Sequence, residues 1–130
     1  MNAIGIALSG VQASVVRLDA SASNIANLNS IGTLGAGQVG NAPYQPVEIS
    51  QSSVAGGGVA TLAGTRRPST FPLYDPSSVS ADESGMVASP DVDLVSETAA
   101  QIEALSAYRA NLSVIRTADQ MEGSLLDLTA

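Results

Sequence analysis

The stretch that decides the fold is Met1–Ser30, MNAIGIALSGVQASVVRLDASASNIANLNS. Apolar residues recur in it at alternating spacings of four and three, the pattern of a helix that packs lengthwise along another helix. A dense run of small residues and Asn closes the stretch and favours a helix end near residues 27–29. The apolar stripe of this predicted helix comprises Ile4, Leu8, Val11, Val15, Leu18, Ala22 and Ile25.

A second long helix is predicted at the other end of the chain, where residues 94–128 contain no Pro. Asp91 or Asp93 is a good N-cap, and Glu97 places a negative charge near the positive end of the helix dipole. We expect this helix to be the packing partner of the first one. Its apolar residues lie mostly at helical spacing: Leu94, Val95, Ile102, Leu105, Tyr108, Leu112, Ile115, Met121, Leu125 and Leu126.

The middle of the chain, residues 31–90, holds all six Pro and nine of the twelve Gly, which excludes a long helix. Residues 44–53 partly alternate and residues 58–65 follow a triple Gly, so together they predict a hairpin joined around 54–57. An isolated two-stranded hairpin is only marginally stable in water, so we expect it to pack against the helices or against neighbouring molecules. We expect an extra loop at 34–40.

The predicted fold is mainly α with a small β part. The long N- and C-terminal helices pack as an antiparallel coiled-coil pair, and the centre forms a β-hairpin with Gly- and Pro-rich loops. One structural unit thus comprises a helix in 1–30, a strand and loop region in 31–90 and a helix in 91–130. Because the chain has only four aromatic residues, we expect a thin core and weak stability as an isolated monomer.

Composition excludes several classes of function. The chain has no His, Cys or Lys, which excludes metal sites of imidazole or thiolate, Ser-His or Cys-His catalysis and Schiff-base chemistry. A net charge of −7 opposes nucleic acid as a partner. The N-terminus lacks the features of a cleaved signal peptide, and no stretch approaches the ~20 apolar residues of a membrane span. We predict no enzyme, no cofactor and no transmembrane segment.

The densest acidic group has two functional interpretations, a calcium loop and a pair of carboxylates that act as acid and base. Its spacing matches no calcium loop, and helix capping explains two of its members. We therefore predict neither a metal site nor catalysis. The group comprises Asp75, Asp82, Glu83, Asp91 and Asp93.

The basic pair Arg66–Arg67 is interpreted in two ways. In the first interpretation it contacts an acidic patch on a neighbouring subunit or an anionic wall component. In the second it is a solvated pair that offsets local charge, and we favour this second interpretation. Asn24 and Asn27 also have two interpretations: they form hydrogen bonds across a subunit contact, or they cap the end of their own helix.

Several segments carry a resemblance to a known family. Those near the N-terminus resemble the N-terminal signature of the bacterial flagellar rod and hook proteins: Ala7–Ala13 (ALSGVQA), Arg17–Asp19 (RLD) and Asn24–Asn29 (NIANLN). Those near the C-terminus resemble the family's C-terminal signature: Ile102–Ala104, Ala107–Asn111 and Thr117–Met121. Tyr74–Pro76 with Asp82–Gly85 is similar to the short proximal-rod members of that family.

The resemblance implies a structural subunit of the flagellar basal-body rod that self-assembles through its terminal helices into a hollow, torque-transmitting shaft. The implied partners are copies of itself, other proximal and distal rod proteins, and components of the MS ring and export gate. It also implies export in the unfolded state, without a cleaved signal peptide, through the flagellar type III apparatus to the periplasm-spanning rod. The alternatives are another short proximal-rod subunit, a non-flagellar coiled-coil adaptor, and a carboxylate enzyme acting on cell-wall glycan.

The predicted site is an assembly interface on the terminal helices. Two helices cannot bury both apolar stripes against each other, and each ~100 Å² of apolar area left in water forfeits about 2.5 kcal/mol. We therefore expect other molecules to cover the apolar surface that the two helices leave exposed. We assign to this interface Ile4, Leu8, Val11, Val15, Leu18, Ala22, Asn24, Ile25, Asn27, Ile102, Leu105, Tyr108, Leu112, Ile115 and Leu125.

Overall fold

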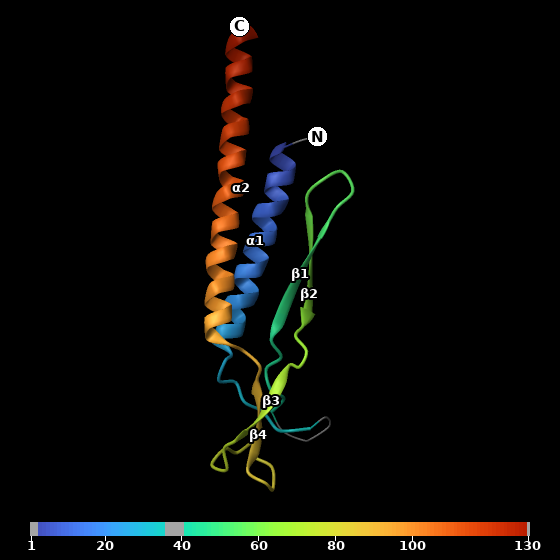
Figure 1. The fold of residues 1–130 in the computed structure, drawn as a ribbon, viewed down its shortest axis with the longest axis vertical. Helices are drawn as coiled ribbons and strands as arrows, with labels where there is room; N and C mark the ends of the chain where they lie inside the picture. The colour runs from blue at the N-terminus through green and yellow to red at the C-terminus, as the bar shows by residue number, and fades with distance from the viewer. Residues whose placement is uncertain (1–2, 36–40, 130) are drawn as a thin grey trace.

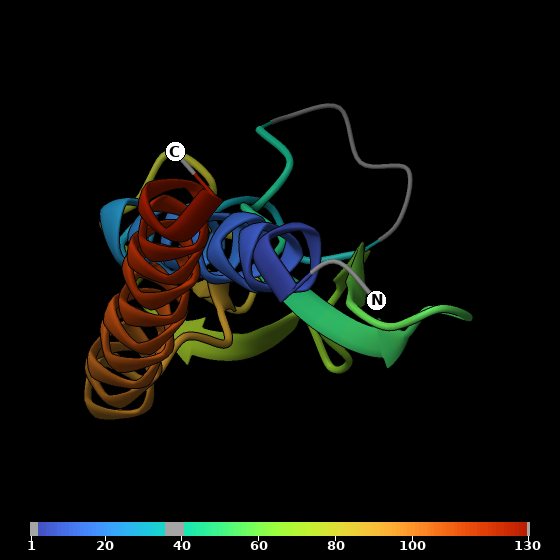
Figure 2. The same ribbon diagram turned by 90° about the horizontal axis from the view of Figure 1, so that it is seen from above.

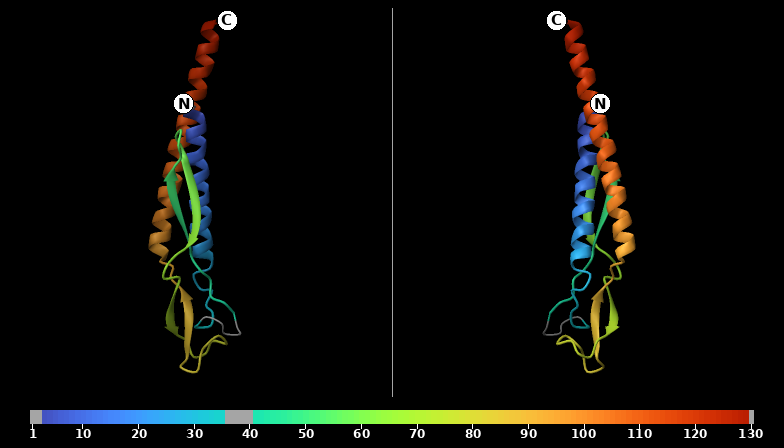
Figure 3. Two further views of the ribbon diagram at one scale, coloured as in Figure 1. Left: turned by 90° about the vertical axis from the view of Figure 1, so that its right-hand side faces the viewer. Right: turned by 90° about the vertical axis from the view of Figure 1, so that its left-hand side faces the viewer.

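The computed structural model describes residues 3–35 and 41–129, so the loop predicted at 34–40 lies mostly outside it. The molecule is elongated, and its two long helices lie side by side and run antiparallel (Figure 1). They are α1, Ala3–Ala26, and α2, Leu94–Thr129, which are about 36 Å and about 54 Å long. The last turns of α2 therefore project beyond the start of α1, as both side views in Figure 3 show.

Local hydrogen bonds explain where the helices end and begin. α1 ends at Ala26, close to the predicted position, and Asn27 Nδ2 donates to the Ser23 carbonyl at 2.9 Å. α2 begins directly after Asp93, whose carboxylate accepts from the Ser96 N–H at 2.9 Å. The predicted N-cap is thus confirmed for Asp93 rather than Asp91.

The predicted central hairpin is also confirmed. β1, Val47–Ser53, pairs antiparallel with β2, Val59–Thr65. The hairpin lies along α1 (Figure 2), and the Val59 N–H donates to Ser9 Oγ at 3.1 Å. At its turn Gly57 comes so close to α1 that a Cβ there would lie 2.8 Å from Ile6 Cδ1. The hairpin therefore packs against a helix, which it needs because an isolated two-stranded hairpin is only marginally stable in water.

A second small sheet was not predicted. β3, Thr70–Tyr74, pairs antiparallel with β4, Met86–Pro90, where the sequence indicated only a link. Pro72 lies inside β3 and normally counts against a strand, but a two-stranded sheet has only edges and tolerates it. The N–H and carbonyl of Ala88 also bond to Gly32 at 2.8 and 2.9 Å. This sheet thereby anchors the chain that follows α1.

The buried apolar core is small. Among the described residues it comprises Ala7, Ala13, Val87, Ala88, Val92 and Ala104, most of them alanines. Side chains of this size bury little apolar area, so their contribution to the free energy of folding is modest. The core is as thin as the sequence predicts.

Candidate assembly surface

Small and polar residues, rather than the apolar stripe, form the contact between α1 and α2. Ala7, Ser14 and Ser21 are buried at intervals of seven residues, and Ser21 Oγ donates to the Glu97 carbonyl at 3.0 Å. A Cβ at Gly10 would lie 2.7 Å from the Asn111 side chain. Small side chains allow this close approach of the backbones. The predicted apolar stripe is therefore not the centre of this contact and lies at its edge, where Val15 and Leu18 meet Leu105 and Tyr108 of α2.

One residue corresponds to a turn of about 100° around a helix. Leu8 and Val15 directly follow the buried residues Ala7 and Ser14, so their side chains point away from the centre of the contact and towards the open side of the helix pair. Val15 and Leu18 line a groove of about 260 Å³ together with Leu105 and Tyr108 of α2. We call these four residues the helix-pair groove. Leu18 is 38% exposed and Leu105 is 41% exposed, so the groove is accessible to a partner.

Apart from Asn24, all the predicted interface residues are exposed or half-buried. Those exposed are Leu8, Val15, Leu18, Ala22, Ile102, Leu105 and Leu125. Those half-buried are Ile4, Val11, Ile25, Asn27, Tyr108, Leu112 and Ile115. Residues of the two predicted stripes thus meet in one groove, although neither stripe is the seam between the helices.

Asn24 is the exception, because it is 1% exposed. Its Nδ2 donates to the Val47 carbonyl at 2.9 Å and to Glu97 Oε1 at 3.0 Å. Its Oδ1 accepts from the Val47 N–H at 2.8 Å and from the Tyr44 hydroxyl at 3.0 Å. Both predicted roles for Asn24, a subunit contact and a helix cap, are wrong. The residue fixes β1 and α2 to the end of α1.

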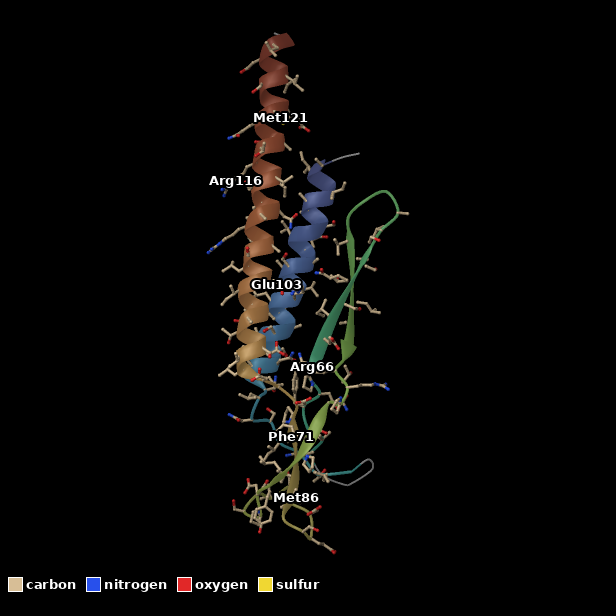
Figure 4. All side chains as sticks on the ribbon, viewed as in Figure 1. Arg66, Phe71, Met86, Glu103, Arg116 and Met121 are labelled. Carbon is tan, nitrogen blue, oxygen red and sulfur yellow. The ribbon has the colours of Figure 1, made fainter. Side chains whose placement is uncertain are left out.

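Arg66 belongs to the same buried cluster. Its guanidinium donates to Glu97 Oε1 at 2.8 Å and to the Asp91 carbonyl at 3.3 Å. Figure 4 shows Arg66 near the end of the helix pair where α2 begins. The solvated role favoured for Arg66 is therefore wrong, because its guanidinium pairs with Glu97 inside the molecule. We call Asn24, Arg66 and Glu97 the polar hub. The sequence missed it because residues this far apart gave no sign that they would meet.

The predicted acidic group does not gather around one point. Asp75 Oδ1 accepts from the Ser77 N–H at 3.2 Å, and Asp82 Oδ1 accepts from the Met86 N–H at 2.9 Å. Both bonds complete local turns. Hydrogen bonds from the Ser96 hydroxyl and the Ser96 N–H lower the pKa of Asp93 below the ordinary aspartate value. Local backbone structure therefore accounts for these three carboxylates.

Within the described residues, α1 is the helix that is long and apolar enough, by length and composition, to cross a membrane. The sequence-based expectation that no stretch is long and apolar enough to span a membrane is therefore corrected for α1. A helix packed inside a protein assembly meets the same criterion. Here α1 packs between α2 and the hairpin, and its polar residue Asn24 pairs with both neighbours.

Comparison with known proteins identifies the family. Residues 83–128 match the family model described as flagellar basal body rod FlgEFG protein C-terminal. The chain is 32% identical over 128 residues to the flagellar basal-body rod protein FlgC of Salmonella typhimurium, covering 93% of this chain and 91% of that protein. It belongs to the FlgC family. The FlgC protein of Agrobacterium fabrum is 35% identical over 129 residues, which are 95% of this chain and 90% of that protein.

Membership of the FlgC family confirms the resemblance seen in the sequence and makes the chain a structural rod protein rather than a member of a known enzyme family. The FlgC similarity spans nearly the whole chain, including both terminal helices and the strands between them. This extent favours a FlgC-type rod protein over the non-flagellar adaptor and over other short rod subunits.

Proposed function

We propose that this chain is a proximal-rod subunit of the bacterial flagellar basal body, and that the apolar face of its helix pair contacts neighbouring subunits. The observation that carries the proposal is the helix-pair groove, where Leu18 and Leu105 stay exposed beside each other. Leaving such side chains in water forfeits about 2.5 kcal/mol for each ~100 Å² of apolar area. Neighbouring subunits that cover this face recover that free energy.

The proposed contacts follow the exposed and half-buried stripes of the two helices. They comprise Ile4, Leu8, Val11, Val15, Leu18, Ala22, Ile25, Asn27, Ile102, Leu105, Tyr108, Leu112, Ile115 and Leu125. Coiled-coil packing of α1 on α2 belongs to the same proposal. It is supported by the seven-residue spacing of Ala7, Ser14 and Ser21.

A rod carries torque, and the polar hub suits that work. Glu97 and Asn24 are buried and bonded to each other, and Arg66 holds the end of β2 against them. These bonds make the hairpin and the helix pair one unit, which transmits force without the parts sliding. We propose that the helices build the wall of a hollow shaft, and that β1–β2 and β3–β4 form an outer layer touching subunits above and below.

The proposal extends to export and partners. The chain travels unfolded through the flagellar type III apparatus to the rod that spans the periplasm, and it meets other rod proteins, the MS ring and the export gate. The small core supports this route, because Val87 and Val92 are the largest buried apolar side chains among the described residues. Little free energy is needed to keep such a chain unfolded.

Gene deletion in the organism that encodes the chain tests the function. Cells without the chain should lack complete rods and swimming motility, and a plasmid copy should restore both. Basal bodies purified from the restored cells should contain the chain, as measured by mass spectrometry. Complete rods in the deletion strain, or rods that lack the chain in the restored strain, would overturn the proposal.

A further inference from the structure

We infer that β2 of one copy pairs edge to edge with β1 of a second copy, so that the hairpins of neighbouring copies join into one antiparallel sheet. The inference rests on the proposed rod function and names a lateral contact for its outer layer. The hairpin is a two-stranded sheet, and no further strand flanks it among the described residues (Figure 1). Each strand therefore has one outer edge whose backbone groups can bind a further strand.

The hydrogen bonds at the two ends of the hairpin show which backbone groups point outward. The Arg66 N–H donates to the Pro46 carbonyl at 2.9 Å, and the Val54 N–H donates to the Gly58 carbonyl at 3.2 Å. Hydrogen-bonded pairs alternate with non-hydrogen-bonded pairs along an antiparallel ladder. Because the register between these two bonds is unbroken, the even-numbered residues of both strands bond to each other. The N–H and carbonyl groups of the odd-numbered residues therefore point outward.

Side chains of α1 already pair with one end of each outer edge. Asn24 accepts from the Val47 N–H at 2.8 Å and donates to the Val47 carbonyl at 2.9 Å, as a neighbouring strand would. On the other strand, Ser9 Oγ accepts from the Val59 N–H at 3.1 Å. Both bonds use odd-numbered strand residues, in agreement with the outward direction of their backbone groups. The remaining outward positions, which we call the open edges, are Ile49, Gln51 and Ser53 on β1 and Thr61, Ala63 and Thr65 on β2.

The open edges lack the features that normally prevent strand pairing. Natural proteins protect edge strands with charged side chains, Pro or bulges. β1 and β2 contain no Pro, and their register runs one to one without a bulge. Glu48 is the one charged residue in the two strands, and its even-numbered position lies outside the open edges. Two seven-residue strands without such protection are typical of edges that another strand covers.

The two open edges fit each other, which makes a second copy the partner. Because β1 and β2 are antiparallel, copies that stand side by side in the same orientation place β2 of one against β1 of the next as an antiparallel pair. The outward groups meet when Ala63 lies opposite Gln51 of the next copy. Leu62 then lies opposite Ser52 of the next copy, whose small side chain leaves room for it.

The positions of the open edges also set an offset between the copies. The open edge of β1 lies towards the hairpin turn and that of β2 lies towards the end of α1, because side chains of α1 hold the opposite ends. Ala63 lies opposite Ile49 in its own hairpin but opposite Gln51 of the next copy, a shift of two residues or about 7 Å. A lateral contact with such a shift does not close into a flat ring, so it builds a helical assembly.

Disulfide trapping tests the inference, because the chain has no cysteine and side chains alternate between the two faces of a strand. Leu62→Cys is combined with Ser52→Cys, which the proposed pairing places opposite each other with Cα atoms about 4.5 Å apart, within the span of a disulfide. The matched control combines Leu62→Cys with Gln51→Cys, the adjacent exposed position whose side chain lies on the opposite face. Each chain carries one cysteine, so every linked pair comes from two copies.

The measurement uses basal bodies from cells that lack the unchanged chain and express both variants, one of them carrying a mass tag. Circular dichroism and a thiol assay on the purified variants first confirm that they fold and that each cysteine reacts. The basal bodies are then oxidised mildly. We expect at least about tenfold more mixed dimer from Leu62→Cys with Ser52→Cys than from Leu62→Cys with Gln51→Cys.

Equal yields from the two combinations would overturn the inference, because strand pairing requires the alternation of faces. So would Ser52→Cys chains that link mainly to one another, because that outcome means a symmetric contact between two β1 edges. Cysteines at both positions that link only to other rod proteins would assign the open edges to a different partner and also overturn it.

Mass spectrometry of the same basal bodies separates this inference from the rod function. If rods contain both variants but the mixed dimer stays at the control level, the strand pairing is wrong and the rod function stands. If rods assemble without the chain while the purified variants link in solution, the strand pairing stands and the rod function is wrong. Rods without the chain and no linkage in solution would overturn both.

Discussion

Arg66 and Glu97 form an ion pair of 2.8 Å that joins the end of β2 to the first turn of α2. Glu97 is 4% exposed, and Asn24 donates to the same carboxylate oxygen. One buried carboxylate therefore fixes the hairpin, α1 and α2 to one another. The bond lies at the end of the helix pair away from the projecting end of α2 (Figure 4).

Replacing Arg66 tests the contribution of this pair to stability. Arg66→Met leaves Glu97 buried with Asn24 as its remaining donor, and an uncompensated buried charge is strongly unfavourable. Because the Arg66 side chain is 31% exposed, we expect a moderate loss of about 2 kcal/mol in the free energy of unfolding. Urea unfolding followed by circular dichroism measures it. The matched control is Arg67→Met, an exposed neighbour expected to change stability by less than about 0.5 kcal/mol. Equal stability of the two variants would contradict the structural role of Arg66.

Gly32 tests the anchoring of the chain to β4. A Cβ at this position would lie 2.3 Å from the Pro43 nitrogen and 2.5 Å from the Asn41 carbonyl oxygen, which are backbone atoms. Gly32→Ala should therefore displace the bridge to Ala88 and cost about 2 kcal/mol of unfolding free energy. Gly64→Ala, where no other atom lies within 4 Å of the added Cβ, is the control and should leave the thermal midpoint nearly unchanged. A Gly32→Ala chain as stable as this control would show that the close approach is not required.

Asp93 gives the cap of α2 a defined pH dependence. Hydrogen bonds from Ser96 lower the pKa of this carboxyl in the folded chain. A lowered pKa means that the cap stabilises the fold above about pH 4 and that this contribution is lost as the pH falls through the lowered pKa. NMR titration of the Asp93 carboxyl should give a pKa below that of an unstructured aspartate. Asp93→Asn retains an accepting oxygen without a titrating group, so its stability should fall less between pH 5 and pH 2 than that of the unchanged chain. Identical pH profiles would contradict this assignment.

The helices and the first hairpin were predictable because their signals are local. An uninterrupted run without Pro between Leu94 and Leu128, and an Asp before it, define α2 in the sequence itself. The Gly-rich turn at 54–57 and the alternation on either side do the same for β1–β2. The β3–β4 sheet escaped prediction because Pro72 masks the strand and because a long connection separates its partners.

The seam between the helices was not predictable from hydrophobicity. Ser14 and Ser21 are polar in the sequence, yet their size lets α1 approach α2, while the larger Leu18 stays at the rim. The polar hub was missed for a related reason. Asn24, Arg66 and Glu97 belong to three different elements, and only the tertiary fold brings them within hydrogen-bonding distance. Sequence therefore indicated which residues line the open face, but not what holds the helices together.

Incorporation of a groove variant into rods tests the central claim, that neighbouring subunits cover the apolar face. Leu18→Asp places a charge in the helix-pair groove, and the control Val95→Asp places the same charge on the first turn of α2, at an exposed position outside the proposed contacts. Losing a buried Leu at a contact costs about 1.5–3 kcal/mol, which corresponds to about tenfold or more in occupancy. Circular dichroism first verifies that both purified variants keep their helix content.

The decisive measurement is the amount of each variant in purified basal bodies, determined by quantitative mass spectrometry against the unchanged chain. We predict at least about a tenfold deficit for Leu18→Asp and normal incorporation for Val95→Asp. Normal incorporation of a correctly folded Leu18→Asp chain would contradict the claim that the groove is covered in the rod.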